Sequence, residues 1–328
     1  MDRRELLGLA TVAAISTRAH ADTMATDGSL PSDSKEIISL WPGMPPGSAG
    51  VTAKSNIVET SKTPDLFHDR AIVHVDVPLL TVYRAARPNG SAVLLIPGGG
   101  YGAEFFEREG IEPAQVFNQS GITCFILRYR LPGDGWANHS DVPLQDAQRA
   151  MRLIRANAGK YGIDPARLGV IGFSAGGHLA ASLATRFAAN VYAPIDAVDT
   201  QDAKPMVAGL MYPVTTLGDG TNSGTRHWLV GDKADAATLD AYSVDKHIPA
   251  DTSPAFICLA ADDPEASPFA NGVAMFGALR AARIPAELHV FEQGRHGFTI
   301  RNIAGKPAAI WPQLFLAWAE PHGFSVRR

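Results

Sequence analysis

An apolar run that ends in a Gly-x-Ser-x-Gly motif constrains this chain more than any other feature of its sequence. Residues 168–173 are typical of a buried strand, Ser174 lies at the centre of the motif, and a helix-compatible stretch of small residues begins at Ala175. A strand, a sharp turn and a helix in this order expose the serine hydroxyl at the end of the strand. The helix N-terminus beneath it favours negative charge at the serine oxygen. The pattern therefore predicts that Ser174 attacks an acyl group.

The same motif could be a glycine-rich turn with an idle serine, so the rest of a hydrolytic site must also be present. A second buried-type strand, residues 92–96, runs into a cluster of glycines at 98–100. Glycine lets the backbone approach a substrate oxygen closely. We expect an oxyanion hole from the N–H of Gly99 or Gly100 and that of Ala175. The cluster lacks the Lys-Ser/Thr ending of a P-loop and the spacing of a dinucleotide fingerprint, which argues against a phosphate site.

The general base is predicted late in the chain, at His296. It lies in a short polar loop that follows a predicted strand, where its ring can reach over the serine. His289 lies inside that strand and is interpreted as structural. His178, on the helix after the serine, is interpreted as a packed or hydrogen-bonded side chain.

The orienting carboxylate is expected between the serine and the histidine in the chain. A predicted strand that ends at Ala260 is followed by Asp262 and Asp263. One of the two would accept the imidazole N–H and stabilise the imidazolium, and the other would cap a turn. Sequence order alone leaves the choice between them open.

These motifs and several others follow one another as in a known family. The chain resembles bacterial α/β-hydrolases of the carbohydrate-esterase type, near acetyl xylan esterases and the feruloyl-esterase-like group. The resemblance implies that Asp263 is the acid, although the Val-Pro that follows the acid in the family pattern is missing here. The segments that carry it are Leu40–Gly43, Pro97–Tyr101, Tyr129–Pro132, Pro143–Ala147, Gly172–His178, Asp262–Asp263 and Gly294–Phe298.

Strand and helix patterns alternate along the chain, which predicts a mostly parallel central sheet with helices on both faces and no large lid domain. This is the α/β-hydrolase fold of the resembled family. The helical patterns are clearest at residues 143–158, 175–187, 269–282 and 308–320. The expected strands are Leu79–Tyr83, Ala92–Ile96, Thr123–Tyr129, Leu168–Phe173, Val207–Tyr212, Phe256–Ala260 and Ala286–Phe291.

The N-terminus has the features of an export signal. An Arg3-Arg4 pair precedes a short apolar stretch, and Ala19-His20-Ala21 has the form of a cleavage site. We expect a twin-arginine-type signal peptide at residues 1–21, an extended lead-in at 22–50 and the α/β-hydrolase domain at 51–328. The mature protein is then expected in the periplasm or outside the cell, with no membrane attachment after cleavage.

Composition excludes several other classes of function. The net charge of −4 and the 19% of charged residues give no footprint for nucleic acid. Cys124 and Cys258 lie in strands expected to be about four strand spacings apart, roughly 19 Å, which is too far for a disulfide. No metal ligand set and no cofactor motif is found, so neither is expected.

The expected function is hydrolysis of short acyl esters, chiefly acetyl, on plant-polysaccharide fragments through an acyl-enzyme. Glycosidic cleavage is not expected, because it usually needs two carboxylates that flank the bond. A general short-chain carboxylesterase and a non-catalytic carbohydrate-binding protein remain as alternatives. Tyr101, Trp136 and Trp228 are the aromatic residues expected to contact a sugar substrate.

Overall fold

The structure is a computed structural model that describes residues 24, 28–30 and 33–324. The predicted signal peptide, residues 1–21, lies outside the described residues. The strands span Ile37–Ser39 (β1), Asn56–Glu59 (β2), Arg70–Val73 (β3), Leu79–Tyr83 (β4), Ala92–Ile96 (β5), Thr123–Arg128 (β6), Leu168–Phe173 (β7), Ala208–Met211 (β8), Ala255–Ala260 (β9) and Ala286–Phe291 (β10). Each of the seven predicted strands is therefore confirmed, with its ends within one residue of the expected positions.

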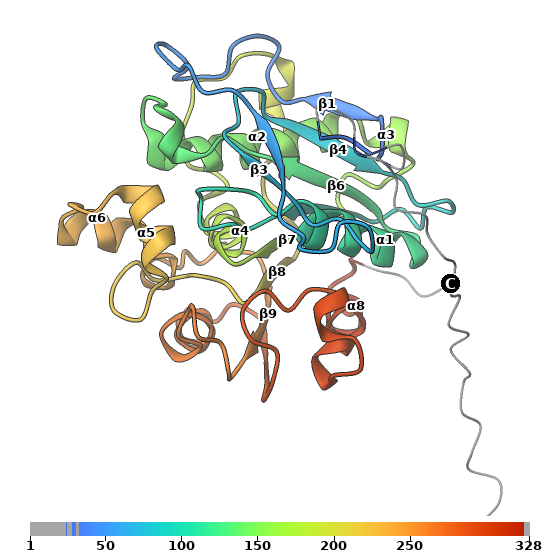
Figure 1. Ribbon diagram of the computed structural model, residues 1–328, viewed down its shortest axis with the longest axis vertical. Coiled ribbons are helices and arrows are strands. Elements are labelled where there is room, and N and C mark those ends of the chain that lie inside the picture. The colour runs from blue at the N-terminus through green and yellow to red at the C-terminus, as the bar shows by residue number, and fades with distance from the viewer. Residues whose placement is uncertain (1–23, 25–27, 31–32, 325–328) are drawn as a thin grey trace, which may run out of the picture.

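Eight strands form one sheet in the order β1-β4-β6-β5-β7-β8-β9-β10 (Figure 1). The pairs β1–β4 and β4–β6 are antiparallel, and every pair from β6–β5 to β9–β10 is parallel. The strands β2 and β3 form a separate antiparallel pair. The carboxyl ends of β5, β7, β9 and β10 consequently meet at one edge, where the predicted catalytic and oxyanion-hole residues follow them.

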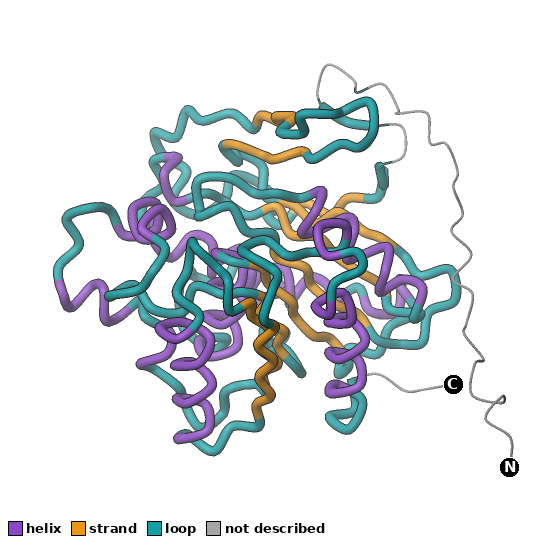
Figure 2. The backbone as a smooth tube through the Cα atoms, turned by 60° about the horizontal axis from the view of Figure 1, so that its bottom comes forward, coloured by secondary structure: helices purple, strands orange, loops and turns teal. Residues whose placement is uncertain are grey.

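Helices cover both faces of this sheet, as predicted (Figure 2). The helices span Glu112–Gln119 (α1), Val142–Ala156 (α2), Ala158–Tyr161 (α3), Ala175–Arg186 (α4), Ser223–Val230 (α5), Ala236–Ala241 (α6), Ala274–Ala281 (α7) and Trp311–Ala319 (α8). Leu94 on β5 packs in one core with residues of α2, α4 and α7, whereas its neighbours Val93 and Leu95 pack in the other core with residues of α1 and α8. Successive residues of a strand face opposite sides, so the continuous apolar run fills both cores.

Of the segment expected to be a lead-in, residues 22–50, the part from residue 33 onward belongs to the folded unit. Its β1 extends the sheet, and Trp41 is buried, with its Nε1–H donating to Asp146 Oδ1 at 2.8 Å. Asp33 accepts two hydrogen bonds of 2.7 Å from the buried guanidinium of Arg70. The expected domain start at residue 51 is therefore too late. The edge strand β1 is only three residues long, which is too short for a strand pattern to be recognised in the sequence.

The last described residues return to the amino ends of the central strands. The carbonyl oxygen of Phe324 accepts hydrogen bonds from the Ser91 hydroxyl, just before β5, and from Arg167, just before β7. Cys124 on β6 and Cys258 on β9 are buried free thiols four positions apart in the sheet, as expected. Within residues 33–324, none of the helices combines the length and apolar character needed to cross a bilayer.

Candidate active site

Ser174 occupies the sharp turn between β7 and α4. Its φ of 54° and ψ of −117° are strained for a residue with a side chain. The turn is closed so tightly that a Cβ at Gly172 would lie 2.1 Å from the Gly176 carbonyl oxygen. A Cβ at Gly176 would lie 2.2 Å from the carbonyl oxygen of Ile96 on β5. The two glycines of the motif are thus required by backbone contacts, and the turn is the predicted strand–turn–helix elbow.

The three residues predicted as nucleophile, base and acid lie in one hydrogen-bonded chain. Ser174 Oγ is 2.7 Å from Nε2 of His296, and His296 Nδ1 is 2.7 Å from Oδ2 of Asp263. With Nδ1 protonated, Nε2 is free to accept the serine proton. The serine side chain is largely shielded, with 8% of Ser174 exposed. Serine, histidine and carboxylate come from the ends of β7, β10 and β9, which adjoin one another in the sheet in the order β7-β8-β9-β10.

Two opposing effects set the pKa of His296. Burial lowers it, but the hydrogen bond and the charge of Asp263 outweigh burial, so the pKa lies above the ordinary 6.5. The charge of Glu265 acts in the same direction as that of Asp263. The Tyr212 ring packs edge-on against the imidazole, with 5.1 Å between the ring centroids. The imidazole is thereby held between a carboxylate and an aromatic wall.

The adjacent Asp262 has the other of the two expected roles. Its Oδ1 accepts the backbone N–H groups of Gly294 and Arg295 at 2.8 and 2.7 Å, so it caps the turn that carries His296. Asp263 also fixes its own loop, since its Oδ1 accepts the N–H groups of Glu265 and Ala266 at 2.8 and 3.1 Å.

The expected oxyanion-hole residues surround the serine. Gly99 and Gly100 line the same pocket as Ser174, and Ala175 is the buried first residue of α4. Gly99 has a φ of 137°, and a Cβ there would lie 2.2 Å from the Ala103 carbonyl oxygen. The loop is closed on itself, because the Gly99 carbonyl accepts the N–H groups of Gly102 and Ala103 at 3.1 Å.

A buried carboxyl group beneath this loop was missed at the level of the sequence. Glu109, in a π-helical turn before α1, accepts the Gly98 N–H at 2.6 Å through Oε2. Its Oε1 accepts the Tyr212 hydroxyl at 2.9 Å. Burial raises the pKa of Glu109. The Glu109 side chain thus links Gly98, at the start of the glycine cluster, to Tyr212, the ring that packs against His296. A glutamate beside Gly110, shortly after the glycine cluster, was the only available signal.

The pocket at the serine has a volume of about 340 Å³ and a largely polar wall. Trp228 is the one predicted sugar contact that lines it, and 42% of this residue is exposed. Its indole fits against Gly102 and Gly133, where a Cβ would lie 2.6 and 2.5 Å from ring atoms. The other polar and charged residues of the wall, which the sequence did not single out, are Arg108, Asn222, Glu265 and Asn302.

Two of the expected sugar contacts lie elsewhere. Tyr101 is 1% exposed, and its hydroxyl lies 2.9 Å from Nδ1 of His178. Trp136 is 4% exposed, and its ring centroid lies 5.1 Å from the guanidinium carbon of Arg130. Neither residue lines the pocket, so both expectations are corrected: these rings pack against the loops that carry them.

His178 is structural, as expected. Its Nε2 lies 2.8 Å from the Tyr242 carbonyl oxygen, and burial lowers the pKa of His178 to about 4.

His289 is also bound away from the site, with Nε2 2.7 Å from Glu287 Oε1. In the described part of the chain, no three or more His, Cys, Asp and Glu side chains gather as a set of metal ligands.

Comparison with known proteins points to one family. Residues 80–270, more than half of the 328, match the BD-FAE family model. An endo-1,4-beta-xylanase B of Butyrivibrio fibrisolvens is 34% identical over 64% of this chain and 33% of that protein. An acetylxylan esterase of Xylanibacter ruminicola is 29% identical over 64% of this chain and 42% of that protein. The chain thus spans a third to about two fifths of the length of these two relatives.

Two further relatives match over most of their length. An ethyl acetate hydrolase of Pseudomonas putida is 28% identical over 72% of this chain and 76% of that protein. The crystal structure of an acetyl ester-xyloside bifunctional hydrolase from Caldicellulosiruptor lactoaceticus superposes with a TM-score of 0.72 and 28% identity. That superposition covers 90% of this chain and 98% of the other.

Proposed function

This chain belongs to the BD-FAE family of α/β-hydrolases, and from that premise we propose that it is a serine esterase that removes short acyl groups, chiefly acetate, from plant-polysaccharide fragments such as xylo-oligosaccharides. The observation that carries the proposal is the hydrogen-bonded chain from Ser174 through His296 to Asp263, with 2.7 Å at each step. Its serine opens onto a pocket lined by Gly99 and Gly100.

The proposed reaction has two steps through an acyl-enzyme. Ser174 Oγ attacks the ester carbonyl while His296 Nε2 takes the hydroxyl proton, and Asp263 stabilises the imidazolium that forms. The N–H groups of Gly99 or Gly100 and of Ala175 bind the oxyanion, and His296 then gives its proton to the sugar oxygen as the bond from that oxygen to the acyl carbon breaks. Water attacks the acyl-enzyme while the same Nε2 takes one of its protons. His296 returns this proton to Ser174 Oγ as the bond from the acyl carbon to Oγ breaks, which releases the acid and restores the enzyme. Each oxyanion donor is expected to contribute about 3–4 kcal/mol to transition-state stabilisation.

Three features of the pocket support a sugar as the alcohol part of the ester. Its wall is largely polar, and it includes the exposed amide of Asn302, which can hydrogen-bond a hydroxyl group. Trp228 presents an exposed ring that is held in place by the glycines it packs against. A fixed aromatic surface beside the nucleophile is suited to stack on a pyranose ring. The relatives named for acetylxylan and acetyl ester-xyloside substrates agree with this assignment.

A general short-chain carboxylesterase is the second candidate. It is favoured by the ethyl acetate hydrolase, which the chain matches over 76% of that protein. Cleavage of the sugar chain is not proposed. The pocket contains the carboxyl groups of Glu109 and Glu265, but both oxygens of Glu109 already accept hydrogen bonds. Glu109 is therefore not free to act as one of the two carboxylates that glycosidases usually need.

The decisive experiment compares four substrates with the purified enzyme. Acetylated xylo-oligosaccharide, feruloylated xylo-oligosaccharide, an aryl acetate and unsubstituted xylo-oligosaccharide are incubated in parallel and followed by mass spectrometry. We expect the highest kcat/KM for release of acetate from the acetylated oligosaccharide, with no shortening of the xylose chain. Faster release of ferulate, or a shorter xylose chain, would contradict the proposal. An aryl acetate as the best substrate would favour the general carboxylesterase, and no turnover at all would favour the non-catalytic carbohydrate-binding protein.

Export to the periplasm or beyond is also proposed, with residues 1–21 removed as a twin-arginine-type signal. The Arg3-Arg4 pair and the Ala19-His20-Ala21 sequence support it. N-terminal sequencing of the protein from its native host is expected to begin at Asp22. An intact Met1 would contradict the assignment.

A further inference from the structure

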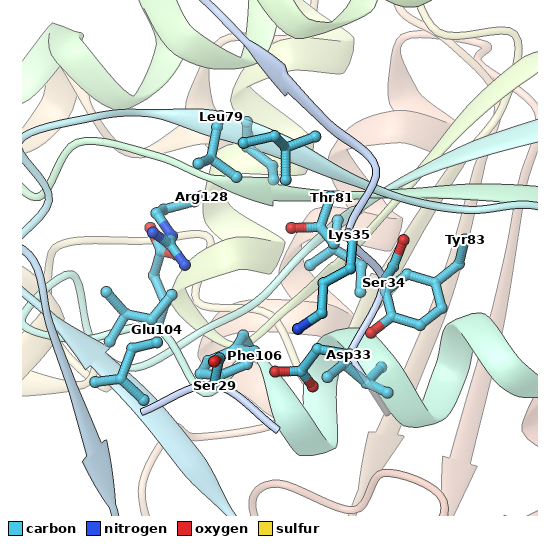
Figure 3. Close-up of a pocket in the computed structure, with 16 residues that line it drawn as sticks. Ser29, Asp33, Ser34, Lys35, Leu79, Thr81, Tyr83, Glu104, Phe106 and Arg128 are labelled. Atoms are coloured by element: carbon cyan, nitrogen blue, oxygen red, sulfur yellow. The ribbon is translucent and has the colours of Figure 1, made fainter. Parts of the chain in front are cut away.

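A second cavity, of about 340 Å³, lies beneath the N-terminal segment (Figure 3). It is bounded by one face of β4 and β6, by the turn before α1 and by residues 33–37. Among the described residues, this cavity and the pocket at Ser174 share no lining side chain. It exists because the N-terminal segment, rather than a helix, covers this end of the sheet.

Most of the cavity wall is apolar. Branched aliphatic side chains from five strands and from the turn before α1 line it, including Ile57, Ile72, Leu79, Ile111 and Ile126. Burying the hydrocarbon part of a ligand against them would contribute roughly 25 cal/mol for each Å² removed from water. The wall therefore suits a hydrocarbon group.

One end of the cavity holds a guanidinium and a carboxyl group without complete sets of hydrogen bonds. Within the part of the chain that the structure describes, the buried Nε of Arg128 and Oε2 of Glu104 have no hydrogen-bond partner. Glu104 is fully buried, and its Oε1 accepts the Tyr129 N–H at 2.7 Å. Figure 3 shows both side chains on the same side of the cavity. Buried polar atoms are nearly always paired, so these two point to a missing partner.

Charge decides what kind of partner fits. Burial raises the pKa of Glu104 well above its ordinary range, which favours the protonated carboxyl, a hydrogen-bond donor at Oε2. Burial lowers the pKa of Arg128, and the charges of Glu104 and Asp76 act against burial. Asp76 is already paired with Lys54 at 3.0 Å, and within the described residues the Nε of Arg128 has no hydrogen-bond partner. Asp33 cannot balance the charge of Arg128, because both its oxygens are bound by Arg70. Lys35 at the rim adds a further positive charge.

We propose that this cavity binds a small monocarboxylate, with its carboxylate on Arg128 and Glu104 and its hydrocarbon tail among the isoleucines and Leu79. A guanidinium binds a carboxylate through two parallel N–H donors, and the Glu104 hydroxyl can donate to the same group. A cavity of roughly 150 Å³ admits benzene, so this one admits on the order of ten non-hydrogen atoms. That size fits a medium-chain acid and excludes a long-chain lipid.

The test is calorimetric titration of the full chain with sodium octanoate, with 1-octanol and acetate as the two partial ligands. We expect saturable binding of octanoate and much weaker binding of octanol and of acetate. Arg128→Met is expected to weaken octanoate binding by about ten- to a hundredfold, the range for a charge-assisted hydrogen bond. Arg280→Met, which removes one charge from the exposed surface of α7, is expected to leave it unchanged. If Arg128→Met does not fold, Arg128→Lys makes the same comparison with the charge kept and the two-donor geometry lost.

The site is independent of ester hydrolysis, because binding is measured directly. Saturating octanoate is expected to leave the KM for an aryl acetate unchanged, whereas competition with the ester would assign octanoate to the pocket at Ser174. That competition, equal affinity for octanol, undiminished binding by the Arg128 variants, or no saturable binding would each overturn the proposal.

Discussion

Asp262 accepts the backbone N–H of Arg295 at 2.7 Å, one residue before the histidine that Asp263 orients. Neighbouring carboxylates therefore act on the same loop in two ways: Asp262 fixes its backbone, and Asp263 fixes the imidazole at its tip. The proposed base is held at both its main chain and its ring before substrate arrives, which is the preorganisation that proton transfer requires.

The two aspartates are expected to differ sharply when each is changed to asparagine. Asp263→Asn removes the charge and presents the wrong partner to His296 Nδ1, so kcat should fall by about 10⁴, as in a comparable triad. Asp262→Asn keeps an oxygen that can accept the two backbone N–H groups, so its loss should be far smaller. Steady-state kinetics on an aryl acetate would measure both. The reverse order of effects would transfer the role of the acid to Asp262.

Ser174→Ala is expected to abolish ester hydrolysis while the fold is kept. Loss of the nucleophile in such a triad costs on the order of 10⁶ in turnover, and alanine removes only the hydroxyl oxygen and leaves the Cβ in place. The rate would be measured alongside the circular dichroism spectrum and melting temperature. A variant that keeps more than about a tenth of the wild-type rate would remove Ser174 from the mechanism.

Activity is expected to rise with pH along an acidic limb centred above 6.5. His296 must be neutral to take the serine proton, and its pKa is raised above 6.5 because the hydrogen bond and charge of Asp263 outweigh burial. Glu265→Gln removes a nearby negative charge that stabilises the imidazolium, so the limb should move to lower pH. Asp251→Asn, an exposed carboxylate that is not among the causes of the shift at His296, is the matched control. A limb that stays in place in Glu265→Gln, or a rate flat down to about pH 4, would contradict this assignment.

The elbow glycines are expected to resist even the smallest side chain. Gly176→Ala places a methyl group 2.2 Å from a backbone oxygen of β5 and should destabilise the protein by at least about 1–3 kcal/mol. Gly159→Ala, in α3, meets nothing within 4 Å and should be neutral or stabilising by up to about 1 kcal/mol. Urea denaturation of both variants checks the contrast. Equal stability of the two would show that the turn has room the structure does not indicate.

Trp228→Ala is expected to separate sugar binding from chemistry. Loss of the exposed indole should raise KM for acetylated xylo-oligosaccharide by about two- to tenfold, since a ring contact is worth roughly 0.5–1.5 kcal/mol. The kcat/KM for ethyl acetate, whose alcohol part has no ring to stack on the indole, should change little. An equal loss for both substrates would indicate that the ring supports the fold of the pocket instead.

The parallel core of the fold could be predicted from the sequence because the strands of this core are continuous apolar runs. Leu168–Phe173 and Ala255–Ala260 are buried on both faces, so every residue contributes to the signal. The strands β1 to β3 were missed because they are only three or four residues long, which is too short for an apolar pattern to stand out. The helix α1 has a proline at its start and only three buried residues, which leaves no clear helical stripe.

The candidate site was predictable where chemistry fixes residue types at the ends of strands. Ser174, His296 and the Asp262–Asp263 pair could be located this way, but only the family resemblance chose Asp263 from the pair. The structure brings Ser174, His296 and Asp263 together. The aromatic contacts could not be sorted from the sequence. Tyr101 and Trp136 lie in loops and Trp228 lies on the short helix α5, and only packing decides which ring turns outward. Glu109 was missed because a buried carboxyl that supports a loop through Gly98 and Tyr212 has no local pattern.

The hydrogen bonds that hold Phe324 beside Ser91 and Arg167 have a practical consequence. They anchor the end of the described chain at the amino ends of β5 and β7, whereas Ser174 follows the carboxyl end of β7. A fusion partner or surface tether joined after Phe324 would therefore be attached on the side of the sheet away from the pocket at Ser174. Enzyme immobilised in that way is expected to keep its pocket open to polymeric substrate.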